Sequence, residues 1–141
     1  MQLKERPVTR AELDMIYEDF RQLEISDGVP QREIRRIELV LEEEGRLIGY
    51  ASGITEHKWL YLTDLWIEES RRRQGLGSRL LRELEQRAAA EGMEHVYLWT
   101  SGPGNPKFYE HNGYQSFAVL EDKYELEGYH QTGLRKELTH T

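Results

Sequence analysis

The chain opens with hydrophobic residues at helical spacing and continues with shorter segments of strand type. Thr9 and Glu12 form the pattern of a capping box, in which each side chain binds the other residue's backbone N–H at the start of a helix. The hydrophobic residues that follow keep helical spacing, which predicts an amphipathic helix that runs to about Ile25. These residues are Leu13, Ile16, Tyr17, Phe20 and Leu23.

Strand-like segments come next, and one of them occupies the middle of the chain. Residues 37–41 and 47–52 are hydrophobic segments joined by an acidic turn at residues 42–45, so they predict a hairpin. Residues 59–67 are aromatic, β-branched or leucine except for Asp64. This composition is typical of a central strand that is covered on both faces.

A second helix is predicted after this central strand. A loop that contains Gly75 and Gly77 leads into it, and Gly92 ends it. The buried stripe of this helix is predicted at Leu80, Leu81, Leu84 and Ala88. The middle of the chain therefore has the order strand, glycine turn, helix.

The last third of the chain predicts three more strands and a short helix. Residues 95–100 form the first strand, and Asn105 with Pro106 predicts the helix start, with Asn105 as N-cap. Gly113 stops this helix, and strands at 114–120 and about 129–138 complete the pattern. Because no repeat or linker interrupts this order, we expect residues 1–141 to form a single α/β (α+β) domain.

Composition limits the compartment and the partners. Of the 141 residues, 38% are hydrophobic and 32% are charged, and no apolar run approaches the ~20 residues that cross a bilayer. The N-terminus lacks the apolar segment of a secretory signal and there is no cysteine, so we expect a soluble, cytoplasmic protein. The net charge of −7 argues against nucleic acid as partner and suits a cationic substrate, and without a long apolar run we expect no membrane partner.

The glycine loop predicts a local exception, an anion site. A helix that begins after a glycine turn has backbone N–H groups without partners, and its dipole adds partial positive charge there. Gly75 and Gly77 let a pyrophosphate approach the N–H groups of residues 73–78, and the triplet Arg71-Arg72-Arg73 adds charge. The alternative is a tight packing turn, because the third glycine of a dinucleotide-binding fingerprint is missing.

Three motifs follow one another along the chain: Leu65-Trp66-Ile67, Arg72-x-x-Gly75-x-Gly77, and Phe108-Tyr109-Glu110-His111-Asn112-Gly113-Tyr114. With them the chain resembles the GCN5-related N-acetyltransferase (GNAT) superfamily over essentially its whole length. The resemblance implies a central, mixed, mostly antiparallel and twisted sheet of six to seven strands, flanked by about four helices. It also implies a splay between the strands at 59–67 and 95–100, acetyl-CoA as cofactor, and direct attack by an amine in a ternary complex.

The resemblance implies roles for individual residues. Tyr109 corresponds to the general acid that protonates the departing CoA thiolate. The backbone of the segment before the loop corresponds to the strand that binds the pantetheine arm, with the N–H of Ile67 facing the thioester carbonyl. The implied cofactor contacts are Leu65, Trp66, Ile67, Arg72, Arg73, Gln74, Gly75, Leu76, Gly77 and Ser78. For Tyr109 and for the strand, the alternative is ordinary core packing.

The general base and one cofactor contact depart from the family's pattern. Some relatives carry a glutamate where this chain has Tyr97, which cannot act as a base at neutral pH, so water or another side chain must serve. Asp64 is the best-placed carboxylate for the base or for contact with the amine, and anchoring a turn is its alternative role. Gly102 occupies the position of the family's asparagine. Asn105, nearer the short helix, binds the cofactor arm or only caps the helix.

We therefore expect an N-acetyltransferase that acts on a primary amine of a small, cationic molecule. A protein N-terminus or lysine as acceptor is an alternative, and a non-catalytic CoA-binding module is a further one. The histidines show no metal-ligand spacing and cysteine is absent, so we expect no metal. The sequence leaves a homodimer open.

Overall fold

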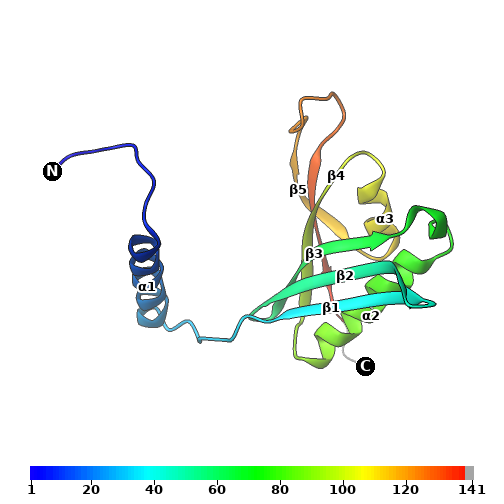
Figure 1. Cartoon of the computed structure of the whole chain (residues 1–141), viewed down its shortest axis with the longest axis horizontal. Coiled ribbons are helices and arrows are strands. Elements are labelled where there is room, and N and C mark those ends of the chain that lie inside the picture. The colour runs from blue at the N-terminus through cyan, green and yellow to red at the C-terminus, as the bar shows by residue number, and fades with distance from the viewer. Residues whose placement is uncertain (139–141) are drawn as a thin grey trace. The chain divides into compact units, whose positions relative to one another are not determined.

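The computed structural model of the chain describes residues 1–138. Their contacts divide the chain into two compact units, Met1–Glu33 and the residues from Ile34 onward. The first unit contains one helix and the second contains the sheet with the remaining helices (Figure 1).

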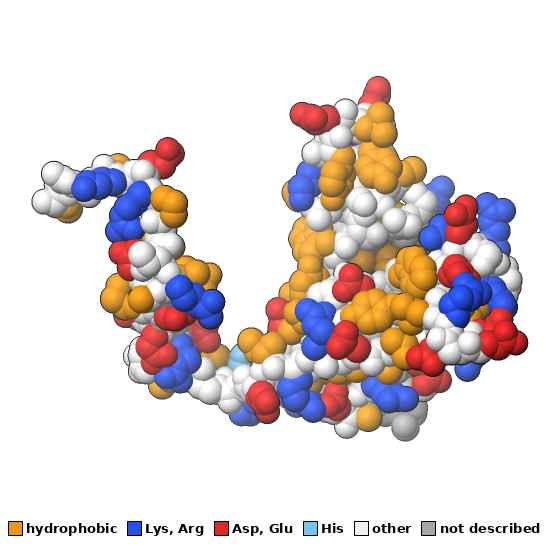
Figure 2. Space-filling view, viewed as in Figure 1, with side chains coloured by type: hydrophobic (Ala, Val, Ile, Leu, Met, Phe, Trp, Pro, Cys, Tyr) orange, Lys and Arg blue, Asp and Glu red, His pale blue; other side chains and the backbone are white. Residues whose placement is uncertain are grey.

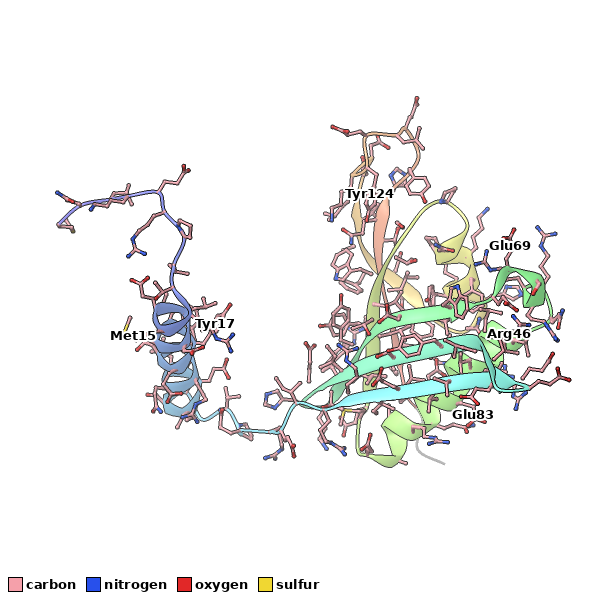
Figure 3. All side chains as sticks on the ribbon, in the orientation of Figure 1. Met15, Tyr17, Arg46, Glu69, Glu83 and Tyr124 are labelled. Atoms are coloured by element: carbon pink, nitrogen blue, oxygen red, sulfur yellow. The ribbon has the colours of Figure 1, made fainter. Side chains whose placement is uncertain are left out.

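The first unit is built around α1, Arg10–Ser26. The predicted capping box is confirmed, because Glu12 N donates to Thr9 Oγ1 at 3.1 Å and Thr9 N donates to Glu12 Oε1 at 2.9 Å. No residue of α1 is buried, and the hydrophobic side chains of Met15 and Tyr17 stand out from the helix (Figure 3). The apolar stripe predicted from the sequence is therefore present on the helix without being buried by its own unit.

A single six-stranded sheet forms the frame of the second unit. The strand order is β1-β2-β3-β4-β6-β5, and only β3 and β4 run parallel, which confirms a mixed and mostly antiparallel sheet. The strand at 59–67 lies inside the sheet as predicted, but its side chains alternate between buried and more exposed positions, so one face is covered less than expected. The strands are β1 Arg36–Glu43, β2 Arg46–Glu56, β3 Trp59–Ile67, β4 His95–Ser101, β5 Gln115–Leu120 and β6 Gln131–Glu137.

Two helices cover one face of this sheet and close the core. They are α2, Leu76–Ala90, and α3, Asn105–His111. The predicted stripe of α2 is confirmed, since its leucines and Ala88 pack with alternate residues of the strands. The core includes Leu60, Leu62, Leu81, Leu84, Ala88, Val96, Leu98, Tyr109 and Leu134. None of the helices in residues 1–138 has the length and apolarity to cross a membrane.

The number of helices differs slightly from the expectation of about four. The described residues hold three α-helices and one 3-10 turn, η1 Glu69–Arg71. Residues 29–35, between α1 and β1, have no regular structure. Pro30 removes a backbone donor there, and the segment is too short and too polar for an amphipathic helix.

The sheet parts between β3 and β4, as the splay predicted from the resemblance requires. Their parallel pairing covers only Trp59–Tyr61 with His95–Tyr97. Beyond Tyr61, β3 stays paired with β2 as far as Ile67, while β4 stays paired with β6 as far as Ser101. The facing edges of β3 and β4 therefore carry backbone N–H and C=O groups that no neighbouring strand uses.

Candidate active site

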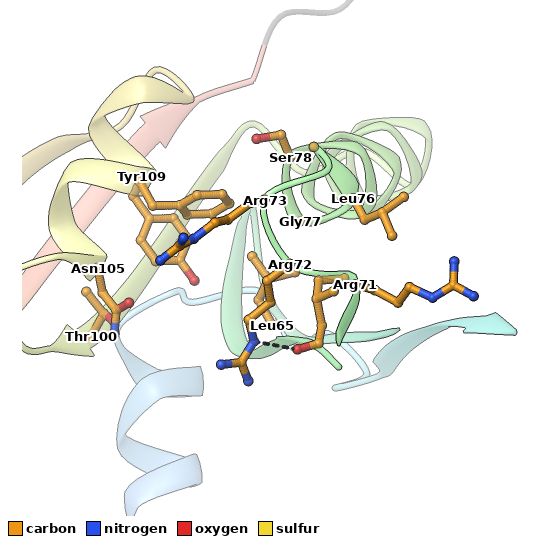
Figure 4. Close-up of a pocket in the computed structure, with 13 residues that line it drawn as sticks. Leu65, Arg71, Arg72, Arg73, Leu76, Gly77, Ser78, Thr100, Asn105 and Tyr109 are labelled. Atoms are coloured by element: carbon orange, nitrogen blue, oxygen red, sulfur yellow. Dashed lines mark hydrogen bonds between the residues drawn. The ribbon is translucent and has the colours of Figure 1, made fainter. Parts of the chain in front are cut away.

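The parted strands border a pocket of about 540 Å³. Its walls come from the end of β3, the loop that leads into α2, the first turn of α2, the end of β4 and α3 (Figure 4). The pocket is therefore formed by segments that lie up to four elements apart in the chain, from β3 to α3. The lining residues are Leu65, Ile67, Arg71, Arg72, Arg73, Gly75, Leu76, Gly77, Ser78, Thr100, Asn105, Phe108 and Tyr109.

The start of α2, where the anion site is predicted, forms one wall of the pocket. Gly75 is the N-cap in the left-handed region, with φ of 77°, which a residue without a β-carbon adopts at no cost. The first bond into the helix runs from Arg79 N to Gly75 O at 3.1 Å. The N–H groups of residues 76–78 therefore have no acceptor within the helix, and together with the helix dipole they attract an anion.

Gly77 has no side chain that would narrow the pocket at this wall. A β-carbon at this position would lie 3.4 Å from Cζ of Phe108 and 3.8 Å from Cγ1 of Ile67, which is ordinary contact. A methyl group therefore fits at residue 77, which lines the pocket. The close approach of a phosphate group to this part of the backbone stays a prediction.

The three arginines of the loop differ in what they contact. Arg72 donates from Nε to the carbonyl oxygen of Ile67 at 2.9 Å, which closes the loop between β3 and α2. Arg71 pairs with Glu43 and extends away from Tyr109 (Figure 4). Arg73 lines the pocket with a left-handed backbone, φ 64°. Basic and acidic side chains mix on the surface around this loop and the β1–β2 turn (Figure 2), so the positive charge is local.

Tyr109 enters the same pocket from α3. It is 8% exposed, and its ring meets the edges of Phe108 at 5.1 Å and of Tyr114 at 5.5 Å between centroids. Burial raises the pKa of its phenol to about 12, so the group is protonated at neutral pH and can donate a proton. The structure therefore brings the predicted acid and the predicted anion site together.

The end of β3 presents backbone groups to the parted edge. Glu68 N donates to Ile48 O at 2.8 Å, and hydrogen bonds alternate along an antiparallel pair. The N–H groups of Leu65 and Ile67 are therefore directed away from β2, toward the pocket. The N–H and C=O groups of Trp66 are directed toward β2. The side chain of Trp66 is 40% exposed and lies on the face of the sheet opposite to that of Leu65 and Ile67.

Not every residue implied by the motifs lines the pocket, and some lining residues were missed. Trp66 and Gln74 are not part of its wall. Thr100 and Phe108 line it but were not predicted as site residues, and Arg71, predicted only to add charge, lines it as well. Phe108 precedes Tyr109 in the helix motif. Thr100 ends the predicted strand 95–100, which was expected to part from the strand at 59–67. Both positions therefore indicated that these residues lie near the site.

Asp64 lies outside this pocket. It is exposed on β3, on the face opposite to that of Leu65 and Ile67. Across the sheet, Asp64 of β3 pairs with Ser52 of β2, and Ser52 pairs with Glu38 of β1. Glu38 accepts a hydrogen bond from Tyr50 Oη at 2.6 Å. This bond, with a smaller effect of the Asp64 charge, raises the pKa of Tyr50. Asp64 and Glu38 therefore lie behind the strand that borders the pocket, together with Arg36, which donates from Nη1 to Ser52 Oγ between them at 2.7 Å.

A second carboxylate was missed by the sequence analysis. Tyr97 donates from Oη to Oε1 of Glu56 at 2.5 Å, and Tyr61 stacks on Tyr97 at 4.8 Å between centroids. Burial, and then the bond to Glu56, raises the pKa of Tyr97, which agrees with its exclusion as a base. Glu56 reaches Tyr97 from the end of β2. The two residues are 41 positions apart in the sequence, so no local pattern reveals this contact.

Asn105 does not cap α3, so that prediction is wrong. The N-cap is Gly104, and Asn105 is the first residue of the helix, with Pro106 in the first turn as predicted. The side chain of Asn105 donates from Nδ2 to the carbonyl oxygen of Ser101 at 2.8 Å. This bond closes the loop after β4 and holds Asn105 at the pocket wall.

A buried phenol and a helix start with unpaired N–H groups thus lie together beside the open edge of a parted sheet. The chain matches the model of the Acetyltransferase (GNAT) family over residues 5–114. It belongs to this family, which confirms the predicted resemblance.

Individual relatives agree with this assignment. The chain shares 31% sequence identity with an acetyltransferase from Bacillus cereus ATCC 14579 whose crystal structure is known. The two structures superpose with a TM-score of 0.83, over 96% of this chain and 98% of the other. It is 36% identical over 81 residues to blasticidin-S acetyltransferase from Streptomyces morookaense, and this match spans 57% of the chain and 60% of that relative. An aminoglycoside 6'-N-acetyltransferase complexed with coenzyme A shares the fold, with 21% identity and a TM-score of 0.67 over 75% of this chain and 74% of that one.

Proposed function

We propose that this protein transfers the acetyl group of acetyl-CoA to a primary amine of a small, cationic molecule by direct attack in a ternary complex. The observation that carries the proposal is that one pocket holds both the start of α2 and the phenol of Tyr109. The family match runs from residue 5 to residue 114 and thus includes parts of both units. This supports one acetyltransferase domain over residues 1–141.

The residues of the pocket fit the parts of acetyl-CoA. The N–H groups of Leu76, Gly77 and Ser78 can take the pyrophosphate, and Arg72 and Arg73 can add charge-assisted bonds. The outward-directed backbone groups of β3 can pair with the amides of the pantetheine arm. Asn105 lies where its carbonyl oxygen can accept a further bond, because its amide nitrogen is used by Ser101.

Two groups of the chain would act on the reacting atoms. Acetyl-CoA supplies an acyl group activated as a thioester. The N–H of Ile67 donates to the oxygen that becomes negative when the amine attacks, and one such donor is typically worth about 3 kcal/mol in the transition state. Tyr109 Oη donates its proton to the sulfur of the leaving thiolate, for which its neutral form at pH 7 is required.

The acceptor would reach the thioester from the face that carries Asp64. Asp64 and Glu38 lie on this face, where the guanidinium of Arg36 offsets part of their negative charge, and β3 and β4 are unpaired beyond Tyr61, next to Asp64. A cationic amine is attracted there, and Asp64 or water then takes the proton that the amine loses.

Replacement of Asp64 tests this placement. Asp64→Asn is expected to raise the KM for the amine about tenfold, because a charge-assisted bond is lost, while the KM for acetyl-CoA changes less than about twofold. Steady-state release of CoA thiol measures both constants. Glu83→Gln, an exposed carboxylate on α2, is the matched control and should leave both unchanged. Equal effects of the two substitutions would remove Asp64 from the acceptor site.

A panel of acceptors tests the function itself. We expect CoA release with polyamines, with an aminoglycoside or with blasticidin S, the last two chosen because relatives are named for them. Peptides with a free N-terminus or lysine form the second arm of the panel. Turnover confined to peptides would establish the protein acetyltransferase alternative. Tight CoA binding without turnover on any amine would establish the non-catalytic CoA-binding module.

A further inference from the structure

A buried polar network lies below the pocket, outside the groups that touch the proposed substrates. Glu85 of α2 is 7% exposed and is the only charged residue within residues 1–138 that is buried. Its Oε2 accepts a bond from Tyr114 Oη at 2.7 Å, and its Oε1 accepts one from Lys136 Nζ at 2.9 Å. Both carboxylate oxygens are thus occupied, by residues of two other segments of the fold.

The network also fixes the end of α3. Lys136 Nζ donates a second bond to the carbonyl oxygen of Asn112 at 2.9 Å, directly after the last residue of the helix. Asn112 in turn donates from Nδ2 to the carbonyl oxygen of Phe108 at 2.8 Å. Gly113, with φ of 92°, makes the turn beside Lys136, and a β-carbon there would come within 3.3 Å of Lys136 Cε. One ammonium group therefore joins β6, α2 and the end of α3.

This end of α3 carries Tyr109. The backbone N–H of Tyr114 donates to Tyr109 O at 3.0 Å, and the two rings meet edge to face at 5.5 Å between centroids. Burial, and then the charge of Glu85, raises the pKa of Tyr114, so this phenol remains a donor to Glu85. Glu85 belongs to the helix whose first turn forms the anion site. The network thus connects the anion site with the proposed acid through two helices.

Stability alone does not require charges at this place. Removing a carboxylate and an ammonium from water is costly, and well-packed hydrophobic residues often give equal or greater stability. A fully bonded buried network does restrict geometry, because each member has a fixed set of partners. We propose that Glu85, Lys136 and Tyr114 are positioning residues that set the place of the Tyr109 phenol relative to the start of α2. This inference rests on the proposed function.

Tyr114→Phe gives the most direct test, because it removes one hydroxyl and keeps the ring against Tyr109. We expect kcat for CoA release to fall about tenfold, since small displacements of a catalytic group cost this much, while both KM values stay within about twofold. In the Tyr109→Phe background the same substitution should have no further effect on kcat. Tyr124→Phe, at an exposed site in the β5–β6 turn (Figure 3), is the matched control and should behave as wild type.

Lys136 provides a second variant pair. Lys136→Met leaves Glu85 without its cation and should lower kcat about tenfold, whereas Lys136→Arg keeps the charge and donors and should restore most of the rate. Thermal unfolding of each variant separates loss of fold from loss of rate. If Lys136→Met lowered kcat by the same factor in wild type and in the Tyr109→Phe background, the two effects would be additive and the network would not act through Tyr109.

An experiment that needs no turnover tests this inference independently of the proposed function. NMR of protein with labelled tyrosine reports the environment and the ring-flip rate of Tyr109 directly. Tyr114→Phe is expected to change both, and Tyr124→Phe to change neither. If wild type releases no thiol, the proposed function fails while this arm still decides the positioning role. An unchanged Tyr109 signal in Tyr114→Phe, or an unchanged kcat, would overturn the inference.

Discussion

Gly77→Glu is expected to abolish CoA binding. Residue 77 lies in the first turn of α2, where the N–H groups of residues 76–78 are free of helical partners. Residue 77 also lines the pocket, so a glutamate there adds bulk and negative charge beside these N–H groups. Its carboxylate would take their bonds and repel a diphosphate. Loss of two or three charge-assisted bonds predicts a rise in Kd of at least about 100-fold, measured by calorimetry with CoA.

Two variants at the same position separate the causes. Gly77→Ala fits beside Phe108 and should stabilise the helix by roughly 0.5–1 kcal/mol, with little change in CoA affinity. Gly77→Gln adds the bulk of glutamate without its charge and should give an intermediate Kd. A negative charge in the first turn of a helix is favourable for the helix itself, so Gly77→Glu should remain folded. Undiminished CoA affinity in Gly77→Glu would disprove the anion site.

Tyr109→Phe is expected to lower kcat for thiol release about 100-fold, while the Kd for CoA stays within about twofold. The phenolic hydroxyl is the only part removed, and general acid catalysis typically contributes a factor of about 100 or more. The ring keeps its contacts with Phe108 and Tyr114, so the pocket keeps its shape. Steady-state kinetics with a saturating amine, together with calorimetry for CoA, measure the two quantities. An unchanged kcat would mean that the thiolate leaves without this acid.

The pH dependence gives an independent check on the same group. An acid must carry its proton to act, and burial raises the pKa of Tyr109 to about 12. Its proton is therefore lost only as the pH rises toward 12, and the wild-type rate should show no decline from Tyr109 between pH 8 and about pH 10. A decline near pH 9 that disappears in Tyr109→Phe would contradict the buried, protonated phenol.

The elements of this protein could be predicted because their signals are local. The capping box at Thr9 and Glu12, the hydrophobic stripe of α2 and the glycines before it depend on spacings of a few residues. Such spacings decide helix start, buried face and chain reversal within one element. The place of the proposed anion site depends on the same kind of signal, since Gly75 is the N-cap of α2 and Gly77 lies in its first turn.

The composition of the site was less predictable, because it depends on which strands become neighbours. β6 enters the sheet between β4 and β5, and this insertion brings Lys136 to Glu85 across 51 positions of the chain. The bulge between Ser52 and Gly53 shifts the register of β3 against β2 before Asp64. A shift of one residue exchanges the two faces of a strand, so the face of Asp64 could not be read from the local pattern.

The sequence alone thus determined the helices and strands, the place of the glycine loop at the start of α2, and which tyrosine is the candidate acid. Only the tertiary structure decided that Asp64 lies behind the pocket, that Thr100 and Phe108 line it, that Asn105 closes a loop, and that Glu56 binds Tyr97. The physical reason is the range of the interactions. Periodicity and capping act within a few residues, whereas strand order and register are set by the burial of the whole core.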